Sequence, residues 1–446
     1  LVGSEMCIRD STDTAFLKPG FRFRFYNIAS IRFPNAPSHQ SNRDHWHLDY
    51  VYLNYDRSIE EDSYPDIAFA NRPGSFLKRY HAMPYRQYRQ NFINEIGDSL
   101  RVRVTNLDNA PANGSYGYSV RRTNGSHIHS YQTGISSFPP FSEAGYVSKD
   151  SIAWPLINFA FPVNDGLHTS YDITHVLESH NGFEPSHNDT VRFRQVFDDY
   201  FAYDDGTAEA GYGLTNPGFM AYRFKLNTPD TLTRVKIFFN RTLNNANQNF
   251  FNLQVWNEFG GKPGELIHEQ LFFRVEYGEG LNGFYTYNLD EPVYIDNVRF
   301  PGLTFYVGLE QTTPAILNIG FDRNRNAKEN IFYFVNNNWY NSMSDGALML
   351  RPVLGTTGVS GIKPGTTTNI PLQVFPNPVS QGILKLNVGE KWLMQSHYQI
   401  MNLTGTTLLE GITARQIDVS NLPSGIYLLR LISGDQTGYA RFVVNK

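Results

Sequence analysis

The sequence predicts an all-β fold made of tandem antiparallel β-sandwiches. Tyr and Phe are abundant, with 27 and 33 residues among 446, and charged residues make up only 18%. Short stretches of alternating apolar and polar residues recur between turns rich in Gly, Pro and Asn, and such alternation is typical of strands with one buried face. A chain of this length has room for three or four domains with separate cores.

The first 62 residues are expected to hold only part of a domain. Residues 1–11 (LVGSEMCIRDS) resemble the translated remnant of a sequencing adapter, and they lack the basic, apolar and small-residue order of a signal peptide. In residues 12–62, the segment DHWHLDYV that begins at Asp44 resembles a strand near the end of jelly-roll domains of the MAM and laminin-G-like kind. Because too few strands are present for a sandwich, this region reads as a truncated jelly roll.

Residues 63–195 are predicted to form an immunoglobulin-like sandwich that serves as a spacer. Strands are expected at 99–107, 115–122, 152–161 and 190–196, with Asn-Gly turns at 113–114 and 124–125 on either side of the second. The four histidines at 127, 129, 168 and 175 show no metal-ligand spacing, so they are expected on the surface.

Residues 196–355 are predicted to form a second jelly roll. The eight expected strands are 219–226, 232–240, 251–256, 271–277, 284–289, 304–311, 317–321 and 347–351. Residues 260–266 (GGKPGEL) are similar to a loop of jelly-roll modules related to carbohydrate-binding domains.

This module carries two candidate sites. The first is a structural calcium site, because carboxylates are the oxygen ligands that calcium takes; its candidate ligands are Asp198, Asp199, Asp204, Asp205 and Glu209. A solvated acidic turn is the alternative, since the spacing is not that of an EF-hand. The second is a glycan site, because aromatic faces stack on sugar rings; its candidates are Trp339, Tyr340 and Trp256. Core packing is the alternative for these aromatic residues.

Residues 356–371 are rich in Gly and Thr and predict a flexible linker, and residues 372–446 predict a small β-sandwich. Their motifs are VFPNPV near the start, DVSNLPSGIYLLR in the middle and ARFVVNK at the end. Together they resemble the type A C-terminal sorting domain of the type IX secretion system of Bacteroidetes. The residues that carry the resemblance are Pro376, Asn377, Pro378, Leu422, Gly425, Tyr427, Arg441 and Lys446.

The resemblance implies export through the periplasm to the outer-membrane surface or the medium, with the secretion machinery as a partner. The net charge of −4 argues against nucleic acid, and no apolar run is long enough for a membrane-spanning helix. Motifs for a serine nucleophile, a zinc protease or a phosphate loop are absent, although two carboxylates on distant strands could still act as a pair.

The sequence therefore predicts a non-catalytic surface protein that serves adhesion or binds glycans or other proteins. Two alternatives remain open. The chain could be the accessory region of a secreted hydrolase, a peptidase or glycosidase, whose catalytic domain precedes it, or a passive surface spacer. No cofactor other than structural calcium is expected.

Overall fold

The computed structural model describes residues 18–26, residues 63–355 except 167, 181–187 and 243–244, and residues 368–446 except 390–391, 394–395, 403–405 and 434–435. The predicted truncated jelly roll (12–62) and linker (356–371) thus lie almost wholly outside the described residues. The described part is nearly all β, as predicted, and none of its helices is long and apolar enough to cross a membrane. The described residues fall into two units, which divide after Asp199.

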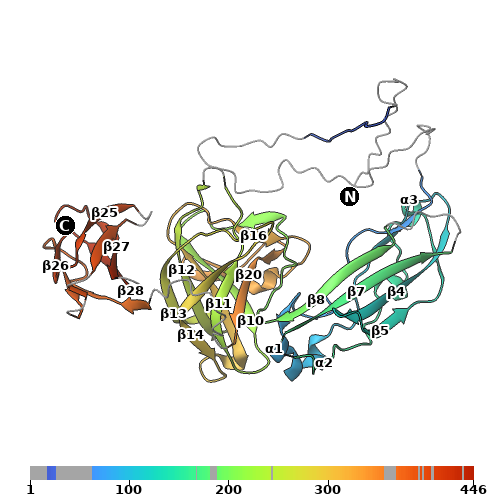
Figure 1. Cartoon of the computed structure of the whole chain (residues 1–446), viewed down its shortest axis with the longest axis horizontal. Coiled ribbons are helices and arrows are strands. Elements are labelled where there is room, and N and C mark those ends of the chain that lie inside the picture. Colours follow the sequence, from blue (N-terminus) through green and yellow to red (C-terminus); the bar gives the residue numbers. More distant parts are fainter. Residues whose placement is uncertain are drawn as a thin grey trace. The chain divides into compact units, whose positions relative to one another are not determined.

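The first unit is built on one antiparallel sheet whose strand order is β2-β8-β7-β4-β5, with β6 beside β4 and only β2 parallel to its neighbour (Figure 1). A two-stranded ladder pairs β1 with β3. The strands are β1 Ile67–Phe69, β2 Met83–Pro84, β3 Val104–Asn106, β4 Ala112–Arg122, β5 His127–Gln132, β6 Ser136–Phe138, β7 Thr169–Ser179 and β8 Thr190–Asp198. The helices are α1 Tyr85–Gln90, α2 Phe92–Glu95, α3 Phe141–Ala144 and α4 Asp150–Ala153.

One face of this sheet is an aromatic core that contains a histidine. Alternate residues of β7 point inward, and His175 is among them with no exposed surface. Its Nδ1 lies 2.8 Å from the Tyr116 hydroxyl, and burial lowers the pKa of the imidazole to about 3. The expectation that His175 lies on the surface is wrong, because it occupies an apolar position of an alternating strand and stays neutral.

Two further local predictions in this unit are wrong. Residues 152–161 do not form a strand: α4 ends at Ala153, and Pro155 has no N–H for a ladder, so pairing is limited to single bonds such as Leu100 N–H to Pro155 O (3.0 Å). Asn113-Gly114 is not a turn but lies inside β4. A Cβ on Gly114 would lie 2.8 Å from carbons of Ile67 and Phe138, so the glycine permits close packing. The turn at 124–125 is confirmed, with φ +88° at Gly125.

Residues 200–355 of the second unit form three antiparallel sheets, ordered β13-β12-β15-β10-β17-β18, β14-β11-β20 and β19-β16-β9 (Figure 1). The strands are β9 Ala210–Tyr212, β10 Gly218–Lys225, β11 Asp230–Ile237, β12 Phe250–Phe259, β13 Lys262–Arg274, β14 Tyr285–Ile295, β15 Thr304–Gln311, β16 Ile319–Asp322, β17 Ile331–Val335, β18 Asn338–Asn341, β19 Ala347–Leu348 and β20 Leu350–Leu354. Two 3-10 turns are η2 Pro301–Leu303 and η3 Lys328–Asn330.

The main core lies between the six-stranded sheet and the sheet of β14, β11 and β20. Phe251, Leu253 and Val255 alternate along β12 and have no exposed surface. The ring of Phe251 meets Tyr287 of β14 edge to face at 5.3 Å, which places this face of β12 against the second sheet. Asn252, Gln254 and Trp256 must then point to the other face, because neighbouring residues of a strand alternate.

The start of this unit is tied to β20 by a buried ion pair. Asp204 has no exposed surface, and its carboxylate accepts hydrogen bonds from Arg351 Nη2 at 2.5 Å and Nε at 3.1 Å. Arg351 also lies over the ring of Phe284, 4.0 Å from its centroid. The guanidinium is thus held by both charge and packing.

The described C-terminal residues form two further sheets, ordered β21-β28-β27-β24-β25 and β22-β23-β26. The strands are β21 Thr368–Pro371, β22 Gln373–Phe375, β23 Ile383–Asn387, β24 His397–Met401, β25 Thr407–Ile412, β26 Gln416–Asp418, β27 Gly425–Ser433 and β28 Gln436–Val444. A separate apolar core of 13 buried residues lies between them, including Leu422 and Tyr427.

The buried pair gives a stability prediction. Arg351→Met removes the partner of a fully buried carboxylate, and such a change costs about 3–5 kcal/mol because the remaining charge is uncompensated. Lys328→Met is the matched control. It breaks the pair of Lys328 with Asp345, whose side chains are 43% and 65% exposed, and should cost much less because solvent screens the pair. Chemical unfolding of the full chain measures both, and equal losses would contradict the prediction.

Candidate functional site

The outer face of the six-stranded sheet carries a second cluster of aromatic residues. Trp256 of β12 lies opposite Tyr306 of β15, and Ala221 of β10 lies opposite Phe332 of β17. These four residues are 5% exposed or less, although they point away from the main core. Some other element must therefore cover them.

The β17–β18 hairpin provides this cover. β12 and β18 are four steps apart in the sheet, about 19 Å at about 4.8 Å per strand. The rings of Trp256 and Trp339 nevertheless meet edge to face with centroids 5.5 Å apart. The sheet must curl so that Trp339 reaches over its face. The turn of the hairpin is Asn336-Asn337, whose φ values of 51° and 61° are those a tight hairpin turn requires and Asn tolerates.

Of the three aromatic candidates of the glycan site, Trp256 and Trp339 lie together and Tyr340 lies apart from them. Trp339 packs on Trp256 and, at 5.2 Å, on Phe334. Tyr340 alternates to the other side of β18, where it stacks on Tyr333 at 5.8 Å and is 44% exposed. Trp339 is half-buried at the rim of the outer face, where it rests on a second candidate, Trp256, and keeps a surface accessible to solvent.

The acidic candidates are divided between the two units. Asp198 ends β8 of the first unit, where its carboxylate lies 2.8 Å from His168 Nδ1, and Asp199 follows it. Asp204, Asp205 and Glu209 belong to the second unit, and Asp204 is engaged by Arg351.

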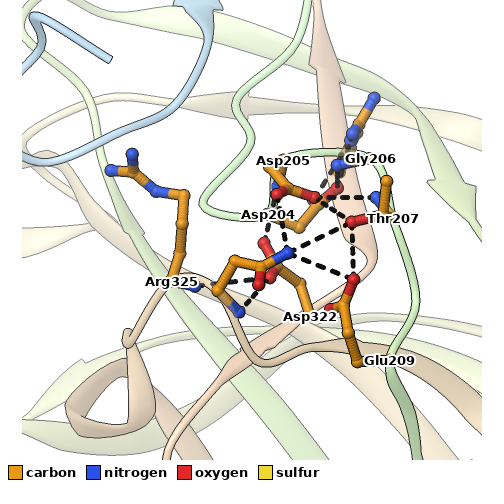
Figure 2. Close-up of polar contacts among 9 residues, drawn as sticks. Asp204, Asp205, Gly206, Thr207, Glu209, Asp322 and Arg325 are labelled. Carbon is orange, nitrogen blue, oxygen red and sulfur yellow. Dashed lines mark hydrogen bonds and ion pairs between the residues drawn. The ribbon is translucent and has the colours of Figure 1, made fainter. Parts of the chain in front are cut away.

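Around Asp205, a dense set of hydrogen bonds joins two distant segments (Figure 2). The Thr207 hydroxyl lies 2.6 Å from Asp205 Oδ1 and 2.8 Å from Glu209 Oε1. The Asn324 amide nitrogen lies 3.1 Å from both Asp205 Oδ2 and Glu209 Oε1. The backbone N–H groups of Thr207 and Arg323 also donate to Asp205 Oδ1 (2.8 Å) and Glu209 Oε2 (2.9 Å), so every oxygen of the two carboxylates accepts a hydrogen bond from a neutral donor. No group of three His, Cys, Asp or Glu side chains is arranged to hold a metal ion among the residues the structure describes.

Asp322 closes the cluster from β16. It has no exposed surface, and it accepts hydrogen bonds from the backbone N–H groups of Asp205 (2.7 Å) and Asn324 (2.7 Å). Burial, reinforced by the negative charge of Asp205, raises the pKa of Asp322 to about 7. Figure 2 shows the side chain of Arg325 directed away from these carboxylates.

Thr207, Asp322 and Asn324 were not predicted as members of this site. Thr207 lies inside the predicted acidic segment but has no charge. Asp322 and Asn324 lie more than a hundred residues later, and their only signal is a polar run (DRNRN) directly after the predicted strand 317–321.

In the C-terminal sheets, several of the predicted sorting residues form hydrogen bonds that tie the ends of this domain together. The Asn377 amide donates to Arg441 O at 3.1 Å and accepts from Val443 N–H at 2.8 Å, so the segment with Pro376 and Pro378 is bound to β28. The peptide bonds before both prolines are cis. The Tyr427 hydroxyl donates to Pro423 O, and Lys446 donates from its backbone N–H to Ser424 Oγ and from Nζ to Ser420 O. Of the other sorting residues, Leu422 is buried, Gly425 begins β27 and Arg441 is exposed.

Comparison with known proteins assigns the C-terminal residues to a family. Residues 373–445 match the family described as the secretion system C-terminal sorting domain. The predicted sorting signal is therefore confirmed, and the protein is a secreted substrate of the type IX system.

No curated protein matches the chain. A mutant alpha-2-macroglobulin of Salmonella is 12% identical over 86% of this chain but only 19% of its own, with a TM-score of 0.24. A biofilm-associated protein (BSP domain) is 9% identical over 88% of this chain and 84% of its own, with a TM-score of 0.15. The beta-glucuronidase of Faecalibacterium prausnitzii is 9% identical over 51% and 37%, also at 0.15. Likenesses this weak carry no argument.

Asp322 gives a pH prediction. Its ordinary pKa is 3.8 and its folded pKa about 7, so between these values the folded chain holds a proton that the unfolded chain has lost. Its contribution to stability therefore falls as pH rises from about 4 to about 7, with a slope of up to about 1.4 kcal/mol per pH unit. Asp322→Asn should gain stability relative to the wild type over this range when divalent cations are absent. Calorimetry at several pH values measures the difference, and a difference constant with pH would contradict the assignment.

Proposed function

We propose that this secreted protein is a non-catalytic binding protein of the bacterial surface, and that it binds glycan on the outer face of its six-stranded sheet. The observation that carries the proposal is the position of Trp339. Its ring is half-buried, rests on the buried Trp256 and keeps a surface open to solvent at the rim of that face.

A ring held in this way suits sugar recognition. Aromatic side chains present broad apolar faces that can stack on sugar rings, and part of the Trp339 ring is open to solvent. Polar side chains share the face. They are Asn252 and Gln254 of β12, Glu310 of β15 and Arg223 of β10. Apolar contact beside a few fixed polar groups is the usual composition of a small-molecule site.

The surrounding modules fit this role as supports. Residues 63–195 would be an immunoglobulin-like spacer, and residues 196–355 a jelly roll that presents the glycan site. The sorting domain points to an organism of the Bacteroidetes, with the mature protein attached to the outer membrane or released, and adhesion to glycans or surface proteins would be its task. As the accessory region of a hydrolase the chain would keep its glycan site, whereas a passive spacer would have none.

Calcium binding at the acidic cluster is the second candidate. Asp205, Glu209 and Asp322 form no ion pair with any described residue, and the groups that donate hydrogen bonds to them are neutral hydroxyl, amide and backbone N–H groups. A hard divalent cation would balance this charge with oxygen ligands, and its binding would have to draw the three carboxylates into a shared coordination geometry that they lack in this structure. Asp204, bound to Arg351, and Asp198 and Asp199, in the first unit, would not take part.

Trp339→Ala tests the glycan site. Glycan-array binding by the full-length protein should be saturable, and the variant should bind at least about tenfold more weakly because the stacking surface is lost. Tyr340→Ala, on the opposite side of β18, is the matched control and should bind as the wild type does. Equal binding by wild type and Trp339→Ala would remove Trp339 from the site, and absence of any binding would favour the spacer.

Calcium should raise the thermal stability of chelator-treated protein. A ligand present at about 100 times its dissociation constant stabilises the folded state by about 2.7 kcal/mol. Glu209→Gln and Asp205→Asn should abolish the response, and Asp198→Asn should retain it. Scanning calorimetry with and without millimolar calcium measures the shift. An unchanged melting temperature in the wild type would show that the cluster holds no calcium.

A further inference from the structure

Two polar atoms on the outer face of the six-stranded sheet lack a hydrogen-bond partner among the described residues. They are Gln254 Oε1 and the Tyr306 hydroxyl, and both are buried. Gln254 is 2% exposed and Tyr306 has no exposed surface. Folded proteins pair nearly all buried polar atoms, because an unpaired one costs free energy, and exceptions call for a missing partner.

The orientation of the Gln254 amide is fixed by a charge. Its Nε2 donates to Glu269 Oε1 at 2.7 Å. The reverse orientation would place the amide oxygen against the carboxylate, so Oε1 has to face away from Glu269. Gln254 therefore offers a hydrogen-bond acceptor to whatever occupies the space beside it.

The two atoms belong to one neighbourhood under Trp339. Tyr306 lies directly opposite Trp256, and Gln254 lies two residues before Trp256 on the same face. Gln254 itself lies opposite Gly308, which lies opposite Ala221 on the next strand, so no large side chain stands beside the amide in this row of the sheet. The Gln254 amide oxygen and the Tyr306 hydroxyl thus flank Trp256 and Trp339, the aromatic pair of the proposed glycan site.

Charges near these atoms select against an anion. Glu269 bonds Gln254, Glu310 bonds Asn252, and the charge of Glu258 helps burial to raise the pKa of Tyr306 to about 12. Arg223, opposite Tyr306 on β10, is the opposing cation: it favours the ionised phenol and so lowers the pKa of Tyr306, while its Nε and Nη2 are directed to Asn330 Oδ1 at 3.0 and 2.9 Å. As a donor Arg223 leaves the phenol proton free to be donated to a ligand. A neutral group that donates to an amide oxygen and accepts from a phenol fits this environment, and a sugar hydroxyl has this chemistry.

We infer that Gln254 and Tyr306 are the hydrogen-bonding subsite of the glycan site and that they select a neutral sugar, whose hydroxyl donates to Gln254 Oε1 and accepts from the Tyr306 hydroxyl. This rests on the proposed function. Among the described strands β18 pairs with β17 alone, and the sugar reaches the two atoms when β18 moves Trp339 off Trp256 and onto the sugar ring.

Tyr306→Phe is the sharpest test, because it removes one oxygen atom. Affinity of the full-length protein for the neutral glycan found on the array should fall about tenfold, which is about 1.4 kcal/mol. The melting temperature without ligand should rise by about 2–4 °C, since an unpaired buried hydroxyl has gone. Gln254→Met should weaken binding similarly, and Tyr340→Phe should alter neither quantity.

The outcomes separate the two proposals. Neutral-glycan binding that depends on Trp339 but is unchanged in Tyr306→Phe and Gln254→Met overturns the subsite and leaves the glycan site standing. Binding confined to acidic glycans such as uronates also overturns the subsite alone. Failure of the wild type to bind any glycan overturns both. Titration calorimetry gives the affinities, and a shift in tryptophan fluorescence on binding reports the movement of Trp339.

Discussion

The central sheet of the second unit is buried on both faces, and this constraint shapes most of what surrounds it. One face packs on β14, β11 and β20 through residues such as Phe251 and Val255. The other carries Trp256 and Tyr306, which would expose large apolar surfaces if nothing covered them. The β17–β18 hairpin curls over this face, and Trp339 at its tip completes the cover. The Trp339 ring therefore packs against a core and is also partly exposed to solvent, so the same residue stabilises the sheet and is the proposed sugar contact.

In the cluster around Asp205, carboxylates rather than apolar groups have been brought together, and bringing their like charges close costs free energy of folding. Asp204 is compensated by Arg351, but Asp205, Glu209 and Asp322 are held by neutral donors and backbone N–H groups. Burial of Asp322 disfavours its charged form, and its pKa rises accordingly. Residues that unite segments so far apart in sequence stabilise the start of the unit only while their charges are balanced, by a proton or by a cation.

Much of the fold could be predicted, because alternation is a local property. The expected strands at 219–226, 232–240 and 304–311 correspond closely to β10, β11 and β15. β17 and β18 were missed because the Asn-rich turn between them is as typical of a loop as of a hairpin. His175 was misplaced because one polar residue in an alternating strand gives no sign of its face. Trp339 was identified as a candidate from its residue type, whereas Gln254, Tyr306 and Asp322 depend on strand pairings that no local pattern reveals.

The bonds of Asn377 to β28 also bear on how the protein is made. Its partners, Arg441 and Val443, are synthesised 64 and 66 residues later, so the first motif of the sorting domain has nothing to bind while the ribosome is still translating the intervening strands. A product of premature termination anywhere in that stretch has the first motif without its partner strand. The folded export signal thus marks chains whose translation has passed β28, and shortened products remain without it.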